Sequence, residues 1–244
     1  MQQLIAKTLA EIVNEKFQTA SVFEKYNLDY CCKGMRSLQQ ACEEENLPVT
    51  TIVEDLKNIY SHSGDSLDFN CIKLYQLAEY IVYTHHSFMK REMRRILSFL
   101  EKVSNKHGIL HNELYKISEL FVELSNEMMR HINAEETIVF PRIKQLEQNG
   151  FEPILFDIKH YQYLQLPIID MEDDDEDVDN KMDTIRKLTN NYTPPADSCT
   201  TFKLLYASLG SFEIDLHQYV HLENNILFPK ALQLEKEIQK SYHN

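Results

Sequence analysis

Four long stretches of the chain place an apolar residue at every third or fourth position, which is typical of helices that pack along one face. They cover residues 71–104, 109–146, 167–189 and 199–236. In the second stretch, steps of alternately four and three residues connect Leu110, Leu114, Ile117, Phe121, Leu124 and Met128. This alternation keeps the apolar seam nearly straight, as a bundle of almost parallel helices requires. The pattern therefore predicts an all-α protein with a four-helix bundle over residues 70–238.

The region before the bundle predicts a small helical domain over residues 1–62. One helix is expected along an apolar stripe formed by Leu4, Leu9, Ile12, Val13 and Phe17. A short helix should follow Ser37, over residues 38–45. Another should begin at Thr51, because Thr51 and Glu54 have the spacing of a capping box. The polar stretch 61–66 is expected to be a linker.

Residues 170–179 are difficult to assign because eight of these ten residues are acidic. Such a run is usually a solvated helix face or a loop. However, Met171, Val178 and Met182 continue the apolar spacing through it. We therefore expect a helix with an acidic outer face.

The composition agrees with a helical fold and limits the classes of molecule that the protein can bind. The chain has only 5 Gly and 7 Pro in 244 residues, too few turn formers for a sandwich or barrel. With 25 basic and 38 acidic residues the net charge is −13, which excludes nucleic acid as a main partner. No apolar run is long enough for a membrane span, and the first residues lack the pattern of a secretory signal, so we expect a cytoplasmic protein without a membrane partner. Five cysteines, two of them adjacent, predict reduced thiols.

Each apolar seam leads to side chains that can bind a metal. Extending the four seams by the same steps reaches His85 on the first, His131 and Glu135 on the second, Asp175 on the third, and Tyr219 and Glu223 on the fourth. Ionisable groups at core positions cost free energy unless they pair or coordinate a metal. Single members could be a core histidine, a buried ion pair, a solvated aspartate or a core tyrosine, but six such groups favour a shared site. Inward Glu and His side chains on facing helices are the ligands of di-iron bundles, and a set without thiolates is less suited to structural zinc.

The other histidines are expected on the surface. His217 and His221 each lie two residues from Tyr219, about 200° around the helix, and His86 is one residue off its seam. Near helix ends or linkers lie His62, His107, His111, His160 and His243.

Five segments carry motifs that are more specific than the spacing alone. They are Tyr26–Gly34 with the pair Cys31 and Cys32, His131–Pro141, Thr189–Pro195, Cys199–Thr201 and Leu222–Pro229. Together they resemble the RIC family, the iron–sulfur cluster repair di-iron proteins (repair of iron centres). The resemblance covers nearly the whole chain.

The resemblance implies a two-domain protein whose hemerythrin-like bundle holds two non-haem iron ions. It implies repair of iron–sulfur clusters damaged by nitric oxide or peroxide, by iron donation or nitric oxide chemistry, with damaged iron–sulfur proteins as partners. By position, the family ligands fall on His85, His131, Glu135 and Glu223. Glu135 and Glu223 would bridge the two ions.

Two positions depart from the family pattern. The family has His in the third helix, where this chain has Asp175, and His four residues before the second bridging Glu, where this chain has Tyr219. If iron binds, a carboxylate and a phenolate should favour the ferric state and weaken chemistry that needs ferrous iron. The alternatives are a degenerate site with weak or single-metal occupancy, a module that binds or senses O₂ or nitric oxide, and a metal-free interaction protein.

The adjacent thiols of Cys31 and Cys32 have two interpretations. Next to Lys33 and the flexible Gly34, they could take up or hand over iron or exchange disulfides, if a thiolate is favoured. Alternatively, they are small buried side chains at a helix end. The remaining cysteines are expected in the core, at positions 42, 71 and 199. The sequence leaves open whether the chain is an enzyme and whether it forms a homodimer.

Overall fold

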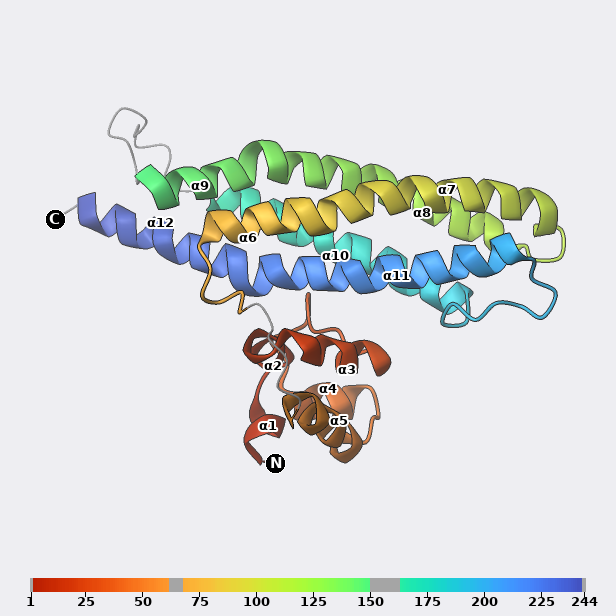
Figure 1. The fold of residues 1–244 in the computed structure, drawn as a ribbon, viewed down its shortest axis with the longest axis horizontal. Coiled ribbons are helices and arrows are strands. Elements are labelled where there is room, and N and C mark those ends of the chain that lie inside the picture. Colours follow the sequence, from red (N-terminus) through yellow and green to blue (C-terminus); the bar gives the residue numbers. More distant parts are fainter. Residues whose placement is uncertain (1, 62–67, 150–162, 243–244) are drawn as a thin grey trace. The chain divides into compact units, whose positions relative to one another are not determined.

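The computed structural model of this chain describes residues 2–61, 68–149 and 163–242, and no strand occurs among them (Figure 1). The all-α fold predicted from composition and spacing is confirmed. The chain divides into two compact units, residues 1–77 with 217–244 and residues 78–216. Apart from Ser61, the expected linker lies outside the described residues.

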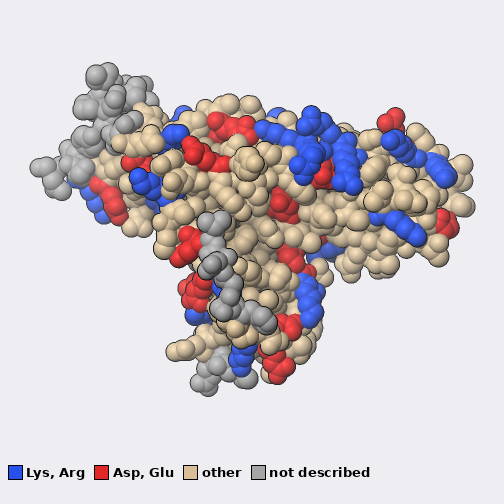
Figure 2. Space-filling view, in the orientation of Figure 1, with Lys and Arg blue, Asp and Glu red and all other residues tan. Residues whose placement is uncertain are grey.

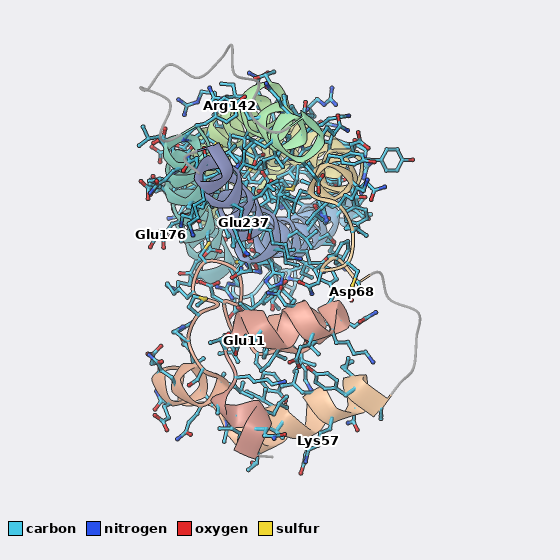
Figure 3. The ribbon with its side chains drawn as sticks, turned by 90° about the vertical axis from the view of Figure 1, so that its left-hand side faces the viewer. Glu11, Lys57, Asp68, Arg142, Glu176 and Glu237 are labelled. Carbon is cyan, nitrogen blue, oxygen red and sulfur yellow. The ribbon has the colours of Figure 1, made fainter. Side chains whose placement is uncertain are left out.

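Short helices make up the first part of the chain. Their bounds are Gln2–Ala6 (α1), Leu9–Glu15 (α2), Phe17–Thr19 (η1, a 3₁₀ turn), Ala20–Lys25 (α3), Leu38–Glu44 (α4) and Val49–Ser61 (α5). They enclose a core of their own, in which Leu9, Phe23 and Ile52 are fully buried. Polar side chains such as Lys57 point away from it (Figure 3).

The stripe from Leu4 to Phe17 is interrupted, which differs from the single helix predicted there. The backbone at Thr8 is extended, and its hydroxyl accepts a hydrogen bond from the backbone N–H of Glu11 at 3.1 Å. The Glu11 carboxylate in turn accepts one from the N–H of Thr8 at 2.8 Å. This capping box starts α2 and thereby separates it from α1.

The capping box predicted at Thr51 and Glu54 is wrong. Helix α5 begins at Val49, so both residues lie inside it, and the backbone N–H of Thr51 donates to the carbonyl oxygen of Pro48 at 3.1 Å instead of to Glu54. The helix expected after Ser37 is confirmed. The Ser37 hydroxyl accepts a hydrogen bond from the N–H of Gln40 at 3.1 Å and caps α4.

Four long helical runs lie near the ranges that the spacing predicts, with ends that differ by up to six residues. Leu110, predicted on the apolar seam of the second run, lies before α8 and is 79% exposed. The first contains α6 (Leu74–Ile81), η2 (Val82–His86) and α7 (Ser87–His107). The second contains α8 (Glu113–Ala134), η3 (Glu135–Val139) and α9 (Phe140–Asn149), and the third is α10 (Gln165–Leu188). The fourth contains α11 (Thr200–Leu222), η6 (Glu223–Leu227) and α12 (Phe228–Tyr242). The segments η2, η3 and η6 are π-helical turns.

The acidic run is helical, as predicted, because it lies within α10. Met171, Asp175 and Val178 face the interior of the bundle and are buried, whereas Asp173 and Glu176 are exposed. Figure 3 shows Glu176 on the outside of the helices. The predicted acidic outer face is therefore confirmed, and one acidic residue of the run, Asp175, is directed inward.

Charge is unevenly distributed over the surface in spite of the acidic composition. Figure 2 shows Lys and Arg side chains gathered along α7, whose sequence contains Lys90, Arg91, Arg94 and Arg95. None of the described helices is long and apolar enough to cross a lipid bilayer.

Candidate metal centre

Three π turns coincide with three metal-capable residues. His86 is the last residue of η2, Glu135 is the first of η3, and Glu223 is the first of η6. A π turn contains about one residue more than an α turn, so it shifts which residue faces the interior, and such turns are frequent at functional sites. All three side chains are fully buried.

The carboxylate of Glu135 lies between two imidazoles. Its Oε2 is 3.2 Å from Nε2 of His86, and its Oε1 is 3.2 Å from Nε2 of His131. The same Nε2 of His131 is 3.4 Å from Oδ1 of Asp175. Each oxygen of one carboxylate thus faces a different imidazole nitrogen, which is the arrangement of a carboxylate that can bridge two cations.

Two groups of three residues offer ligand atoms that all lie within 4.8 Å of one another. One group is His86, Glu135 and Glu223, and the other is His131, Asp175 and Glu223. Both groups are fully buried. Nitrogen and carboxylate oxygen donors without thiolates suit iron and similar cations better than a structural zinc.

A second carboxylate, that of Glu136, contacts the ring nitrogen of His86 that does not face Glu135. Nδ1 of His86 lies 2.9 Å from Oε1 of Glu136, and Nζ of Lys90 lies 2.7 Å from the same oxygen. Partial burial raises the pKa of Glu136, but the hydrogen bonds from Lys90 and His86 outweigh it and hold the pKa below its usual value. An ionised carboxylate can only accept, so Nδ1 of His86 carries the proton, and Nε2 is the nitrogen that faces Glu135.

His131 has a strongly perturbed pKa. Burial lowers it, but the charges of Glu135 and Asp175 act in the opposite direction and raise it well above the usual value. Its Nδ1 lies 3.7 Å from Oδ2 of Asp174 on the exposed side of α10. Perturbation by burial and by named charged neighbours is typical of functional sites.

The prediction that His86 lies on the surface is wrong, since its side chain is fully buried. The seam from Leu77 through Ile81 assumes α-helical steps, but η2 inserts the extra residue of a π turn before His86. His85, the predicted ligand, is also buried, and its Nδ1 lies 3.1 Å from Oδ1 of Asp215. The structure brings His86, rather than His85, against Glu135.

The surface prediction also fails for His221, which is fully buried. Its Nε2 lies 3.0 Å from Oδ1 of Asn14 and its Nδ1 lies 3.4 Å from the carbonyl oxygen of Tyr30. His217 is half-buried, with Nδ1 2.9 Å from Oε1 of Glu24. Periodicity within one helix cannot show that Asn14, Glu24 and Tyr30 contact these two side chains.

Two residues that depart from the family pattern occupy interior positions. Asp175 is 1% exposed and belongs to the second ligand group. Tyr219 is fully buried and precedes Glu223 by four residues on the same helical run, so the two side chains lie on one face.

The adjacent thiols lie in the first domain beside an aspartate. Oδ1 of Asp29 accepts hydrogen bonds from the backbone N–H groups of Cys31, Cys32 and Lys33 at 3.1, 3.0 and 3.2 Å. The thiol of Cys31 donates to the same oxygen at 3.3 Å. Cys31 is buried and Cys32 is half-buried, and the carbonyl oxygen of Cys31 accepts a hydrogen bond from Nδ2 of Asn225 at 3.0 Å.

None of the five cysteines forms a disulfide, as the sequence predicts. The expectation that the other three lie in the core holds for Cys42 alone. Cys71 is exposed and Cys199 is half-buried, because both lie in segments that connect helices.

Comparison with known proteins extends these findings. Residues 5–60 match a family described as "Domain of Unknown function (DUF542)", and residues 78–231 match the "Hemerythrin HHE cation binding domain". A "Probable iron-sulfur cluster repair protein" of Haemophilus influenzae is 30% identical, covering 86% of this chain and 90% of that protein. "Iron-sulfur cluster repair protein ScdA" of Staphylococcus epidermidis is 28% identical over 91% of this chain and 96% of its own length.

"Iron-sulfur cluster repair protein YtfE" of Musicola paradisiaca is 29% identical, and the match covers 94% of this chain and 97% of that protein. These matches include both parts of the chain, the helices that carry Cys31 and Cys32 and the bundle that carries Glu135. The chain belongs to the hemerythrin HHE cation-binding family, within the group of iron–sulfur cluster repair proteins that join this domain to an N-terminal DUF542 domain.

Proposed function

We propose that this protein is a di-iron protein that repairs iron–sulfur clusters damaged by nitrosative or oxidative stress. The relatives that match both of its domains are named as iron–sulfur cluster repair proteins. The position of Glu135, with one oxygen toward His86 and the other toward His131, is the main support. Damaged iron–sulfur proteins would be its targets.

The donor set fits two iron ions in number, type and charge. His86, Glu135 and Glu223 would hold one ion, and His131, Asp175 and Glu223 the other, with Glu135 and Glu223 as bridges. Three buried carboxylates meet two imidazoles in this cluster, an excess of negative charge that is costly without cations. Two divalent cations would compensate it.

Iron bound in this cluster could be released when its oxidation state changes, or it could bind nitric oxide. The residues of the chain then have separate tasks. Glu136 keeps the proton on Nδ1 of His86, so that the lone pair of Nε2 is available to bind iron. Cys31 and Cys32 are the proposed site at which iron is passed on, and Asp29 fixes the backbone of both.

A repair assay with defined variants tests the proposal. Wild-type protein should contain two iron ions per chain and should restore activity to an enzyme whose iron–sulfur cluster has been damaged by nitric oxide. Glu135→Gln keeps the size of the side chain but removes the charge, and it should lose both iron and repair. Glu123→Gln, at an exposed position of the same helix α8, is the matched control and should retain both.

Other results would decide between the alternatives. Stable nitric oxide adducts without cluster restoration would mean a binding or sensing module. One iron or none per wild-type chain would mean a degenerate site and would contradict the di-iron proposal. The metal-free alternative predicts the same melting temperature with and without iron, because only a ligand that binds the folded state raises it.

A further inference from the structure

Helix α7 carries a stripe of basic side chains along one face (Figure 2). Its 21 residues include six Lys and Arg but only two Glu, in a chain whose net charge is −13. Successive residues of an α-helix are rotated by about 100°, so the residues 3, 4, 11 and 15 positions after Arg91 lie within about 60° of it. All of these residues are basic and exposed, and together with Arg91 they form the basic stripe: Arg91, Arg94, Arg95, Lys102 and Lys106.

No acidic residue of α7 lies on this face. Between the members of the stripe the face carries serine and asparagine, whereas Glu92 and Glu101 lie about 80–100° around the helix from Arg91. Glu92 is 5% exposed, and its carboxylate lies 3.3 Å from Nε of Arg91 and 3.4 Å from Nη1 of Arg95. One carboxylate beside two guanidinium groups leaves an excess of positive charge.

The other three members of the stripe, Arg94, Lys102 and Lys106, make no ion pair with a carboxylate among the described residues. Nε of Arg94 donates to the carbonyl oxygen of Lys90 at 3.0 Å, which uses one N–H group and leaves the charge at the surface. These exposed charges are therefore available to an anionic partner.

Two aromatic rings restrict the arginine side chains of the stripe. Cζ of Arg91 lies 5.3 Å from the ring centroid of Phe88, and Cζ of Arg95 lies 5.3 Å from that of Phe99. At this distance a guanidinium group is attracted to the face of the ring. A side chain that is already ordered loses less conformational entropy on binding, and the planar guanidinium can bind a carboxylate through two hydrogen bonds. The two arginines are thus suited to acidic side chains.

The basic stripe begins close to the proposed iron site. His86 precedes Arg91 by five residues, which is about 7.5 Å along the helix axis. Between them, Nζ of Lys90 lies 2.7 Å from the oxygen of Glu136 that also contacts Nδ1 of His86. From Arg91 the stripe extends about 22 Å to Lys106. A macromolecule lying along the stripe would therefore be held next to His86.

We propose that the basic stripe of α7 is a docking surface for an acidic surface of the damaged iron–sulfur proteins. This inference rests on the proposed function, which supplies that class of partner. Complementary charges accelerate the encounter of two proteins and fix their relative orientation. On a chain that is acidic as a whole, the stripe would determine which side of the bundle an acidic partner approaches.

The observations favour a protein over other anionic partners. The net charge of −13 opposes a polyanion such as nucleic acid, which needs Lys and Arg to replace its counterions. A helix that binds a membrane surface inserts its apolar face, but the apolar face of α7 is buried at Met89, Met93, Ile96 and Leu100. A folded protein with a patch of carboxylates needs only the exposed side chains of the stripe.

Binding to a damaged iron–sulfur hydratase of net negative charge tests the docking surface apart from repair. Full-length wild-type protein should bind this enzyme, and the dissociation constant should rise at least about tenfold between roughly 50 and 300 mM salt, because salt screens exposed charges. The variant with Arg91→Glu, Arg94→Glu and Arg95→Glu should bind at least about tenfold more weakly. In repair it should raise the KM for the damaged enzyme and keep the rate at saturation and the iron content.

A second stripe variant and a matched control make the result specific. Lys102→Glu with Lys106→Glu lies away from Glu92 and should also weaken binding, so the test does not depend on the folding of the arginine variant. The control combines three exposed positions outside α7 and changes the net charge by the same amount as the arginine variant: Lys57→Glu, Lys203→Glu and Lys236→Glu. It should bind within about twofold of wild type, because no member of the stripe is changed.

The readouts separate the docking surface from the proposed function. Glu135→Gln, which should lack iron, should bind the damaged enzyme as wild type does. Binding through the stripe without repair would support the docking surface and reject the repair function. Equal binding by wild type and both stripe variants would overturn the docking surface, whatever the repair activity. It would also be overturned if a DNA duplex, phosphatidylserine vesicles or a second copy of the chain bound the stripe more tightly than the damaged enzyme.

Discussion

Nε2 of His86 lies 3.2 Å from the Glu135 carboxylate, although the two residues come from different helical runs. Its neighbour His85 is also buried but lies with Nδ1 3.1 Å from Asp215. Two consecutive histidines are thus turned toward different carboxylates. This difference favours His86 over His85 as a ligand in the proposed iron site.

His86→Ala should remove iron and His85→Ala should not. The first change deletes a nitrogen that faces Glu135, whereas the second deletes one that faces Asp215. We expect His86→Ala to reduce iron from two ions per chain to one or none, as His131→Ala should. Metal analysis of the three purified variants checks this. Iron loss confined to His85→Ala would mean that the α-helical seam, and not the π turn, identifies the ligand.

Glu136→Gln should weaken metal binding without removing a ligand. An amide can present its oxygen to Nδ1 of His86, but it lacks the charge that holds the proton there and that pairs with Lys90. Loss of such an outer partner typically lowers metal affinity by about 10–100-fold. Competition with a chelator measures the affinity, and Glu123→Gln should be unchanged. Equal affinity in Glu136→Gln and wild type would show that Glu136 does not orient the imidazole.

Much of the bundle could be predicted because apolar spacing is a local property of the sequence. The approximate positions of the four helical runs and the inward position of Asp175 both follow from steps of three and four residues. The His86 register could not be predicted in this way. A π turn adds a residue where neighbouring helices favour it, and the local pattern around residues 82–86 contains no separate signal for it.

The first domain illustrates a second limit of the sequence pattern. Both Thr8 with Glu11 and Thr51 with Glu54 have the spacing of a capping box, yet only the first pair forms one. The burial of His221 depends on contacts with residues about two hundred positions away in the chain, which no local pattern contains. Long-range packing decides such cases.

Tyr219→Phe tests whether the phenol belongs to the iron site. If the phenolate binds ferric iron, the wild-type protein should show a visible charge-transfer band, and Tyr219→Phe should lose it while staying folded, because only the hydroxyl is removed from a buried ring. Visible spectra of the iron-loaded proteins measure this. An iron-loaded wild type without the band would exclude Tyr219 as a ligand and leave it a core residue.

Acid should destabilise the protein through His221 before most carboxylates titrate. Burial lowers the pKa of His221 to about 4, from an ordinary value of 6.5 that should apply in the unfolded chain. The neutral form therefore stabilises the fold fully above pH 6.5, and this contribution is lost as the pH falls toward 4. The free energy of unfolding should be about 2 kcal/mol lower at pH 5 than at pH 7 from this group alone.

In His221→Gln, whose side chain can still donate to Asn14 but does not titrate, this part of the pH dependence should disappear. Urea unfolding at the two pH values measures it, and NMR titration of the wild-type imidazole with a pKa near 6.5 would contradict the prediction.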